Sequence, residues 1–140
     1  MGYDLFIDEI LHGVVALPFA VFIFYKTKNW KLPLITLFAI YAIDTDHILD
    51  FWRFRAFSID VGLFFQLDYF DQTGKALVLF HAWEWLLIMA YFSIKKGWNY
   101  WLTAVSLGIF AHLLWDSHTV GSIMFYSFIY RASTGFSIPF

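Results

Sequence analysis

Four apolar stretches, each about as long as a bilayer-crossing helix, dominate this 140-residue sequence; they cover residues 9–25, 32–52, 76–94 and 98–116. An α-helix needs about 20 predominantly apolar residues to cross the hydrocarbon core of a membrane. The residues are 61% hydrophobic and only 14% charged, whereas a soluble domain is roughly 25% charged. We therefore expect an all-α, polytopic membrane protein, with residues 1–140 forming a single integral membrane domain built as a bundle of four transmembrane helices.

The connections between the stretches differ in length and charge. Residues 26–31 and 95–98 are short and together hold five lysines and no acid. Because basic loops tend to stay in the cytoplasm, we expect both of them there, with the termini and the long connection on the opposite side. That connection, 53–75, is rich in Phe, which predicts either a loop lying at the membrane interface or an ordinary surface loop with aromatic anchors. The apolar segment 119–130 is too short to cross and predicts a C-terminal half-helix.

Charge and cysteine content narrow the function. The formal net charge is −2, so a nucleic-acid partner, which requires a basic phosphate-binding surface, is not expected. The chain has no cysteine, which excludes disulfides, thiolate metal ligands and a cysteine nucleophile. The acidic start of the chain does not resemble a secretory signal, so we expect the first apolar stretch to be a retained helix.

Titratable side chains interrupt all four apolar stretches, near one end of each. The first and third stretches carry them in their first half, namely His12 in the first and His81 and Glu84 in the third. The second and fourth carry them near their C-terminal end, namely Asp44, Asp46 and His47 in the second and His112 and Asp116 in the fourth. Because successive helices of an up-and-down bundle are antiparallel, all of these groups are expected at the same end. At about 1.5 Å rise per residue, the histidines would lie roughly 5–8 Å below the membrane surface. Ionisable groups at this depth are normally paired and functional.

The spacing of these residues favours a metal site. Three pairs share one helical face because their members are three or four residues apart: Asp44 with His47, His81 with Glu84, and His112 with Asp116. Imidazole and carboxylate groups are donors that zinc and other divalent ions accept in proteins. Taken singly, each side chain has an ordinary alternative, such as a histidine bonded to a backbone carbonyl. Together they predict six metal ligands: His12, Asp44, His47, His81, His112 and Asp116.

The number of donors bears on the metal and on the catalytic residues. Six donors exceed the four of a tetrahedral zinc, so we expect either one divalent ion with outer carboxylates or two ions sharing an aspartate. Zinc is the first choice, and manganese and iron are the alternatives. Glu84 is expected to act as the general base, with Asp46 as the alternative catalytic residue.

The order of these residues resembles that of a known membrane family. It is similar to the membrane-bound metal-dependent hydrolases, the family of the LexA-regulated inner-membrane hydrolase, at His12-Gly13, Asp44-x-Asp46-His47, His81 and His112-x-x-x-Asp116-Ser117. The resemblance covers residues 12–117 and implies a hydrolase in the inner membrane of a prokaryote. Two positions depart from the family's pattern: Ile43 stands where the family has proline, and nothing before His81 matches the family's His-Arg-Gly.

A metal site at the depth of the head groups favours a membrane lipid as the substrate. The sequence therefore predicts a metal-dependent hydrolase of a lipid ester or phosphoester, integral to the cytoplasmic membrane, with its site on the extracytoplasmic side. A membrane di-iron oxidoreductase is the first alternative, because Asp44-x-x-His47 imitates the acid-x-x-His spacing of di-iron bundles. A metal or proton transporter is the second, although the half of the stretches near the basic loops carries few polar groups, such as Thr36 and Thr103.

Overall fold

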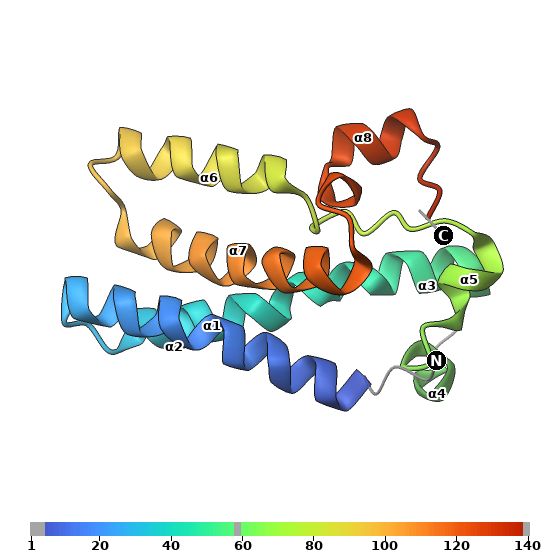
Figure 1. Ribbon diagram of the computed structural model, residues 1–140, viewed down its shortest axis with the longest axis horizontal. Helices are drawn as coiled ribbons and strands as arrows, with labels where there is room; N and C mark the ends of the chain where they lie inside the picture. Colours follow the sequence, from blue (N-terminus) through green and yellow to red (C-terminus); the bar gives the residue numbers. More distant parts are fainter. Residues whose placement is uncertain (1–4, 58–59, 139–140) are drawn as a thin grey trace.

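The chain is helical throughout the part that the structure describes. The computed structural model describes residues 5–57 and 60–138 and contains no β-strand within them. The elements, in chain order, are α1 (Leu5–Thr27), α2 (Lys31–Ala42), the 3-10 helix η1 (Ile43–Asp46), α3 (His47–Arg55), α4 (Val61–Phe64), α5 (Asp68–Thr73), α6 (Trp83–Lys95), α7 (Tyr100–Val120), the 3-10 helix η2 (Met124–Tyr126) and α8 (Phe128–Ser133). The all-α class predicted from the sequence is confirmed for these residues (Figure 1).

The long helices lie side by side along the long axis of the molecule (Figure 1). α1, α2 and α7 pack against one another, while α6 packs on α7. We call the end formed by the α1–α2 and α6–α7 connections the turn end. The opposite end, where α3, α5, the α5–α6 connection and α8 gather, is the site end. The turn end consists of long helices and their short connections, whereas the site end contains short helices and a non-helical connection.

Small side chains let α2 and α7 approach each other closely. A methyl group placed on Gly108 would collide with the carbonyl oxygen of Thr36 and lie 2.8 Å from Cβ of Ala39. The buried Thr36 hydroxyl donates to the Leu32 and Ala104 carbonyl oxygens at 3.2 and 3.1 Å. This close packing holds the first half of α7 against α2.

Two helices of the described chain are long and apolar enough to cross a membrane. One covers Ile7–Thr27, and the other covers Lys31–Arg55, where α2, η1 and α3 run on without interruption. Only 22% and 33% of their most apolar windows are buried inside the protein. Large apolar side chains therefore point outward, and Phe38, for example, is 73% exposed. α7 has 21 residues but is not one of these two helices.

The predicted third span, 76–94, is helical only in its second part. α6 begins at Trp83 and has 13 residues, which at 1.5 Å per residue is about 20 Å and falls short of the roughly 30 Å hydrocarbon core. Residues 76–82, predicted to be its first part, form no helix. A bundle of four full spans is therefore not confirmed.

Side chains from other elements explain why residues 76–82 stay out of the helix. The Asp50 carboxylate accepts hydrogen bonds from the backbone N–H groups of Leu77 and Val78, both at 2.7 Å, and Asp46 accepts one from Phe80. From the other side, Arg131 donates to carbonyl oxygens of the same segment. These bonds replace the intrahelical bonds that the segment gives up.

The region after α7 also differs from its prediction. The expected half-helix at 119–130 is not one element, because α7 continues to Val120 and is followed by η2 and then α8. Gly121 adopts a left-handed conformation, with φ of 72°, and ends α7. The chain then turns back over the site end (Figure 1).

Candidate metal centre

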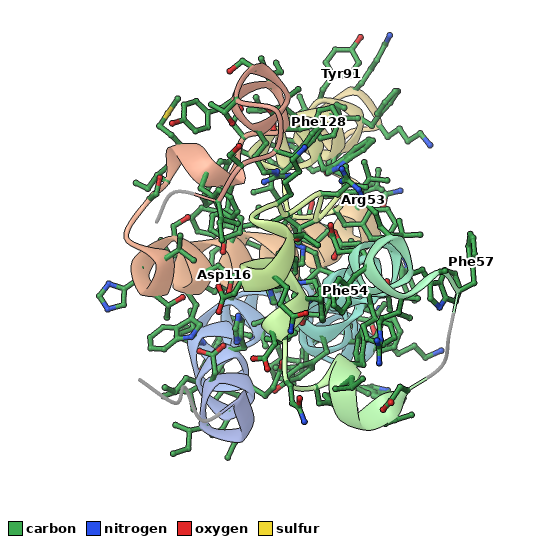
Figure 2. All side chains as sticks on the ribbon, turned by 90° about the vertical axis from the view of Figure 1, so that its right-hand side faces the viewer. Arg53, Phe54, Phe57, Tyr91, Asp116 and Phe128 are labelled. Atoms are coloured by element: carbon green, nitrogen blue, oxygen red, sulfur yellow. The ribbon has the colours of Figure 1, made fainter. Side chains whose placement is uncertain are left out.

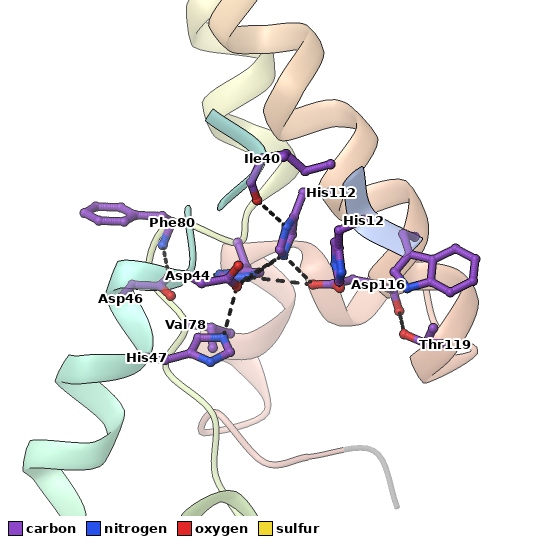
Figure 3. A network of polar contacts seen from close by, with 12 residues as sticks. His12, Ile40, Asp44, Asp46, His47, Val78, Phe80, His112, Asp116 and Thr119 are labelled. Atoms are coloured by element: carbon purple, nitrogen blue, oxygen red, sulfur yellow. Dashed lines mark hydrogen bonds and ion pairs between the residues drawn. The ribbon is translucent and has the colours of Figure 1, made fainter. Parts of the chain in front are cut away.

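Four potential ligand atoms meet at the site end, between η1, the α5–α6 connection and α7 (Figure 3). They are Oδ1 of Asp44, Nε2 of His81, Nε2 of His112 and Oδ2 of Asp116. The two imidazole nitrogens lie 3.0 Å apart. Asp44 Oδ1 lies 3.2 Å from His81 and 3.4 Å from His112. Asp116 Oδ2 lies 3.2 Å from His112 and 3.7 Å from His81.

These five separations are close to the distance between neighbouring ligands of one tetrahedral metal ion. Zinc binds imidazole nitrogen and carboxylate oxygen at about 2.0–2.1 Å, so neighbouring ligands of a tetrahedral ion lie about 3.3 Å apart. The separations given above run from 3.0 to 3.7 Å and surround that value. The ligands come from three separate segments of the chain, so their convergence is a property of the whole fold.

Local structure explains how each ligand reaches the centre. His112 and Asp116 are one turn apart on α7 and therefore share a face. Asp44 lies in η1, where the helix tightens to 3-10 geometry before it continues as α3. His81 lies in the non-helical connection, two residues before Trp83 begins α6.

Hydrogen bonds fix the tautomer of three histidines. In each, Nδ1 donates a hydrogen bond to an oxygen. The acceptors are the Asp8 carbonyl oxygen for His12, at 3.0 Å, Asp46 Oδ2 for His81, at 3.1 Å, and the Ile40 carbonyl oxygen for His112, at 2.7 Å. In a neutral ring the lone pair then lies on Nε2, which faces the centre in His81 and His112 and faces Asp116 in His12. Metal-binding histidines usually hold their second nitrogen in this way.

The electrostatics of the centre favour a cation. Two unprotonated ring nitrogens only 3.0 Å apart repel each other, and the adjoining carboxylates add negative charge. Carboxylate oxygens of Asp46 and Asp44 lie 3.1 and 3.2 Å from the two ring nitrogens of His81. A positive charge among these groups is therefore stabilised, whether a proton or a metal ion supplies it.

His12 and His47 flank the centre on two sides (Figure 3). His12 Nε2 lies 2.8 Å from Oδ1 of Asp116, whose other oxygen faces His112. A carboxylate shared in this way can bridge two ions. His47 Nε2 lies farther out, 3.8 Å from Oδ1 of Asp44, and its side chain is 19% exposed. The structure thus brings all six predicted ligands to one end, with four of them around one point.

The two predicted catalytic carboxylates lie in different places. Asp46 is buried beside the centre, where Oδ2 accepts from His81 and from the Phe80 N–H, while Oδ1 has no hydrogen-bond partner within the described chain. Glu84 is not part of the cluster. Its carboxylate accepts from the Ser127 hydroxyl at 2.6 Å and from two backbone N–H groups at the start of α8. It therefore holds the first turn of α8 in place.

Two residues that support the centre were not among the predicted site residues. Asp50 fixes the backbone before His81, and its spacing of four residues from Asp46 could have shown that both carboxylates share one helical face. Arg131 is fully buried and donates to the His81 carbonyl oxygen at 2.8 Å. No local pattern marks Arg131, because two of its three carbonyl partners lie about 50 residues earlier in the chain.

A cavity of about 620 Å³ opens beside the centre at the site end. His47, His81 and Asp116 form part of its wall, so the metal-ligand cluster faces the cavity directly. The segment from Phe65 to Asp71, which includes the start of α5, lines another part of the wall. Figure 2 looks onto this end of the molecule, with Asp116 near the middle of the face.

No family model, no curated protein and no solved structure matches this chain.

Proposed function

We propose that this protein is a membrane-embedded, metal-dependent hydrolase that acts on a lipid ester or phosphoester at the level of the head groups. The observation that carries the proposal is the convergence of two imidazole nitrogens and two carboxylate oxygens, five of whose separations lie between 3.0 and 3.7 Å, beside a cavity of about 620 Å³. A cavity of this size is within the range of about 300–1,000 Å³ that small-molecule sites occupy.

The donor set suits a divalent ion, with zinc as the first choice. Two imidazoles and two carboxylates are hard or borderline donors, which zinc, manganese and ferrous iron all accept. The fixed tautomers, with Nδ1–H of His81 and His112 bonded to outer oxygens, pre-orient both nitrogen ligands. A bound divalent ion would acidify a coordinated water and polarise a carbonyl or phosphoryl group, which is what hydrolysis at neutral pH requires.

The way the backbone is satisfied supports placement in a membrane. Non-helical backbone at membrane depth is tolerated only where protein groups replace water as hydrogen-bond partners. Residues 76–82 meet that condition, because Asp46 and Asp50 accept from their N–H groups and Arg131 donates to their carbonyls. The outward-facing apolar side chains of the two candidate spans are the surface that lipid would cover. The short basic connections at the turn end favour a site on the extracytoplasmic side.

We assign different roles to the residues around the centre. Asp44, His81, His112 and Asp116 hold the ion, and Asp116 also links it to His12, where a second ion could bind. Asp46 positions His81 through its Nδ1–H. His47 lines the cavity but stays outside the four-atom set, so it is the group best placed to take a proton from an attacking water. The position of Glu84 gives no support to the same role for that residue.

The test is lipid turnover by purified protein in mixed lipid–detergent micelles. Hydrolysis should disappear on chelation and return when zinc is restored. His47→Ala should lower turnover by roughly 10²–10⁴-fold while the metal stays bound, and His118→Ala, which removes an exposed histidine of the same chain, should have no effect. A metal-loaded protein that cleaves neither a carboxylic nor a phosphate ester of any lipid would contradict the proposal, and stoichiometric iron would favour the oxidoreductase alternative.

A further inference from the structure

The cavity beside the metal centre has one apolar part. Its apolar wall includes Phe65, Leu67, Phe70, Val78, Val120 and Phe125, which come from the α4–α5 region, the α5–α6 connection and the segments after α7. Such a wall suits the acyl or glyceryl part of a lipid and keeps water away from the ligand cluster.

The charged groups of the cavity are all acidic. Asp8, Asp68, Asp71 and Asp116 line it, and no lysine or arginine does. Asp68 and Asp71 lie on α5, where both are exposed. Within the described chain every ion pair joins a histidine to an aspartate. No lysine or arginine of the described chain therefore forms an ion pair with either of these two carboxylates.

This charge distribution bears on what the cavity can accept. An anionic head group is normally recognised by arginine or lysine side chains, and an acidic wall repels it. An ammonium group is attracted by the same wall, because a cleft lined by one sign of charge concentrates the opposite sign. The aromatic rings of Phe65, Phe70 and Tyr126 in the wall add surfaces on which an ammonium group binds favourably.

We propose that the cavity selects lipids whose head group carries an ammonium group, with the ester or phosphoester directed toward His81 and Asp116 and the ammonium held near Asp68 and Asp71. This inference rests on the proposed function, because it names the substrate class of the same site. Asp116 belongs to the ligand set and Asp8 accepts the indole N–H of Trp115, which leaves the two α5 carboxylates to recognise the head-group charge.

The experiment compares two lipids with the same acyl chains, phosphatidylethanolamine and phosphatidylglycerol, in micelles of one neutral detergent. Both contain the same ester and phosphoester bonds, and only the first has an ammonium group. Metal-loaded protein should cleave phosphatidylethanolamine with a kcat/KM at least about tenfold higher. The double variant Asp68→Asn/Asp71→Asn should bring that ratio close to one through KM, with metal content unchanged.

Asp60→Asn is the matched control. It removes one carboxylate from the same region, outside the cavity wall, and asparagine can still cap α4 as Asp60 does. This variant should keep the wild-type preference. Equal cleavage of the two lipids by the wild type, or an unchanged preference in the double variant, would overturn the inference and leave the proposed function standing.

Binding of ether-linked analogues, which lack the carboxylic ester, provides a readout that does not depend on acyl-ester cleavage. The wild type should bind the ethanolamine analogue at least about tenfold more tightly than the glycerol analogue, and the double variant should bind both alike. If no lipid is cleaved but this binding preference is present, the proposed function fails while the inference holds. Absence of the binding preference overturns the inference.

Discussion

The turn end and the site end of this molecule use different means to satisfy buried polar groups. At the turn end, continuous helices bond their own backbone, and the buried polar side chains are hydroxyls such as Thr36 and Ser93. At the site end, the buried polar groups include Asp46, Asp50 and Arg131, all at most 5% exposed. Charged side chains there take over bonds that a helix would otherwise make.

The comparison explains where the ligands lie. His81 can face the centre because the chain leaves helical geometry just before α6, and Asp44 because the helix tightens at η1. The departure before α6 gives up regular backbone bonds, which would be costly in an apolar environment, whereas η1 keeps backbone bonds of 3-10 type. The buried aspartates and Arg131 offset that cost, so the site depends on groups that never touch the proposed ion.

The largest expected effect comes from removing the buried arginine. Arg131→Met leaves three carbonyl oxygens, those of Val78, His81 and Phe125, without their donor. We expect the free energy of unfolding in detergent to fall by about 3–5 kcal/mol, because three hydrogen bonds from a charged donor, each worth about 1.5–3 kcal/mol, are lost while the desolvation cost of the guanidinium is removed. Thermal unfolding of the purified variant measures the loss.

Arg55→Met is the control for this variant, because Arg55 is exposed at the end of α3. Its loss should change stability by less than about 0.5 kcal/mol. If the two variants were equally stable, Arg131 would not stabilise the α5–α6 connection, and the site end would not depend on buried charged groups.

Two variants, Asp50→Asn and Asp46→Asn, distinguish the aspartate that stabilises the backbone of the α5–α6 connection from the one that orients the ligand His81. In Asp50→Asn, an amide replaces one of two oxygens that each accept an N–H. Stability should fall by about 1.5–3 kcal/mol, with metal affinity of the folded protein nearly unchanged. In Asp46→Asn, the amide oxygen can still accept from His81, but the negative charge is lost. Metal affinity should then fall about 10–100-fold.

Metal titration and thermal unfolding of both variants check this prediction. Equal losses of stability and equal losses of metal affinity in the two variants would contradict the prediction. In that case the aspartates would act as one unit, and no division between holding the segment and tuning the ligand would exist.

The smallest effect is expected for close packing away from the site. In Gly108→Ala, the new methyl group would meet backbone atoms of α2, so stability should fall by about 1–2 kcal/mol through overpacking. Gly62→Ala, where the added methyl group lies 3.5 Å from its nearest neighbour, is the control. Metal affinity should be unchanged in both variants, and a large loss in Gly108→Ala would show that packing along the helices sets the geometry of the centre.

Helical periodicity and the direction of the helices were enough to predict that the side chains on α1, α7 and the α2–η1 segment meet. His112 and Asp116 are one turn apart, and the antiparallel order of the long helices brings His12 and Asp44 to the same end. These relations depend only on spacing and direction, which the sequence contains. The roles of the residues, in contrast, stay predictions.

The break before α6 could not be predicted in the same way. The run from Ala76 to Ala82 is almost uniformly apolar, and such a run fits a helix as well as a buried extended segment. Hydrogen bonds to distant residues decide between the two. The Leu77 N–H donates to Asp50, 27 residues earlier, and the Val78 carbonyl oxygen accepts from Arg131, 53 residues later. Hydropathy contains no information on partners so distant in the sequence. The position of Glu84 was missed for the same reason, because its partners lie at the start of α8.

The most direct test of the central claim is the metal content of the purified protein, measured by elemental mass spectrometry. His112→Ala and His118→Ala should be measured beside the wild type, since they remove a clustered and an exposed histidine from the same helix. We expect about one or two equivalents of zinc or another divalent ion in the wild type and in His118→Ala, and loss of the ion in His112→Ala. A folded protein that takes up no metal when metal is supplied, or an equal loss in both variants, would contradict it.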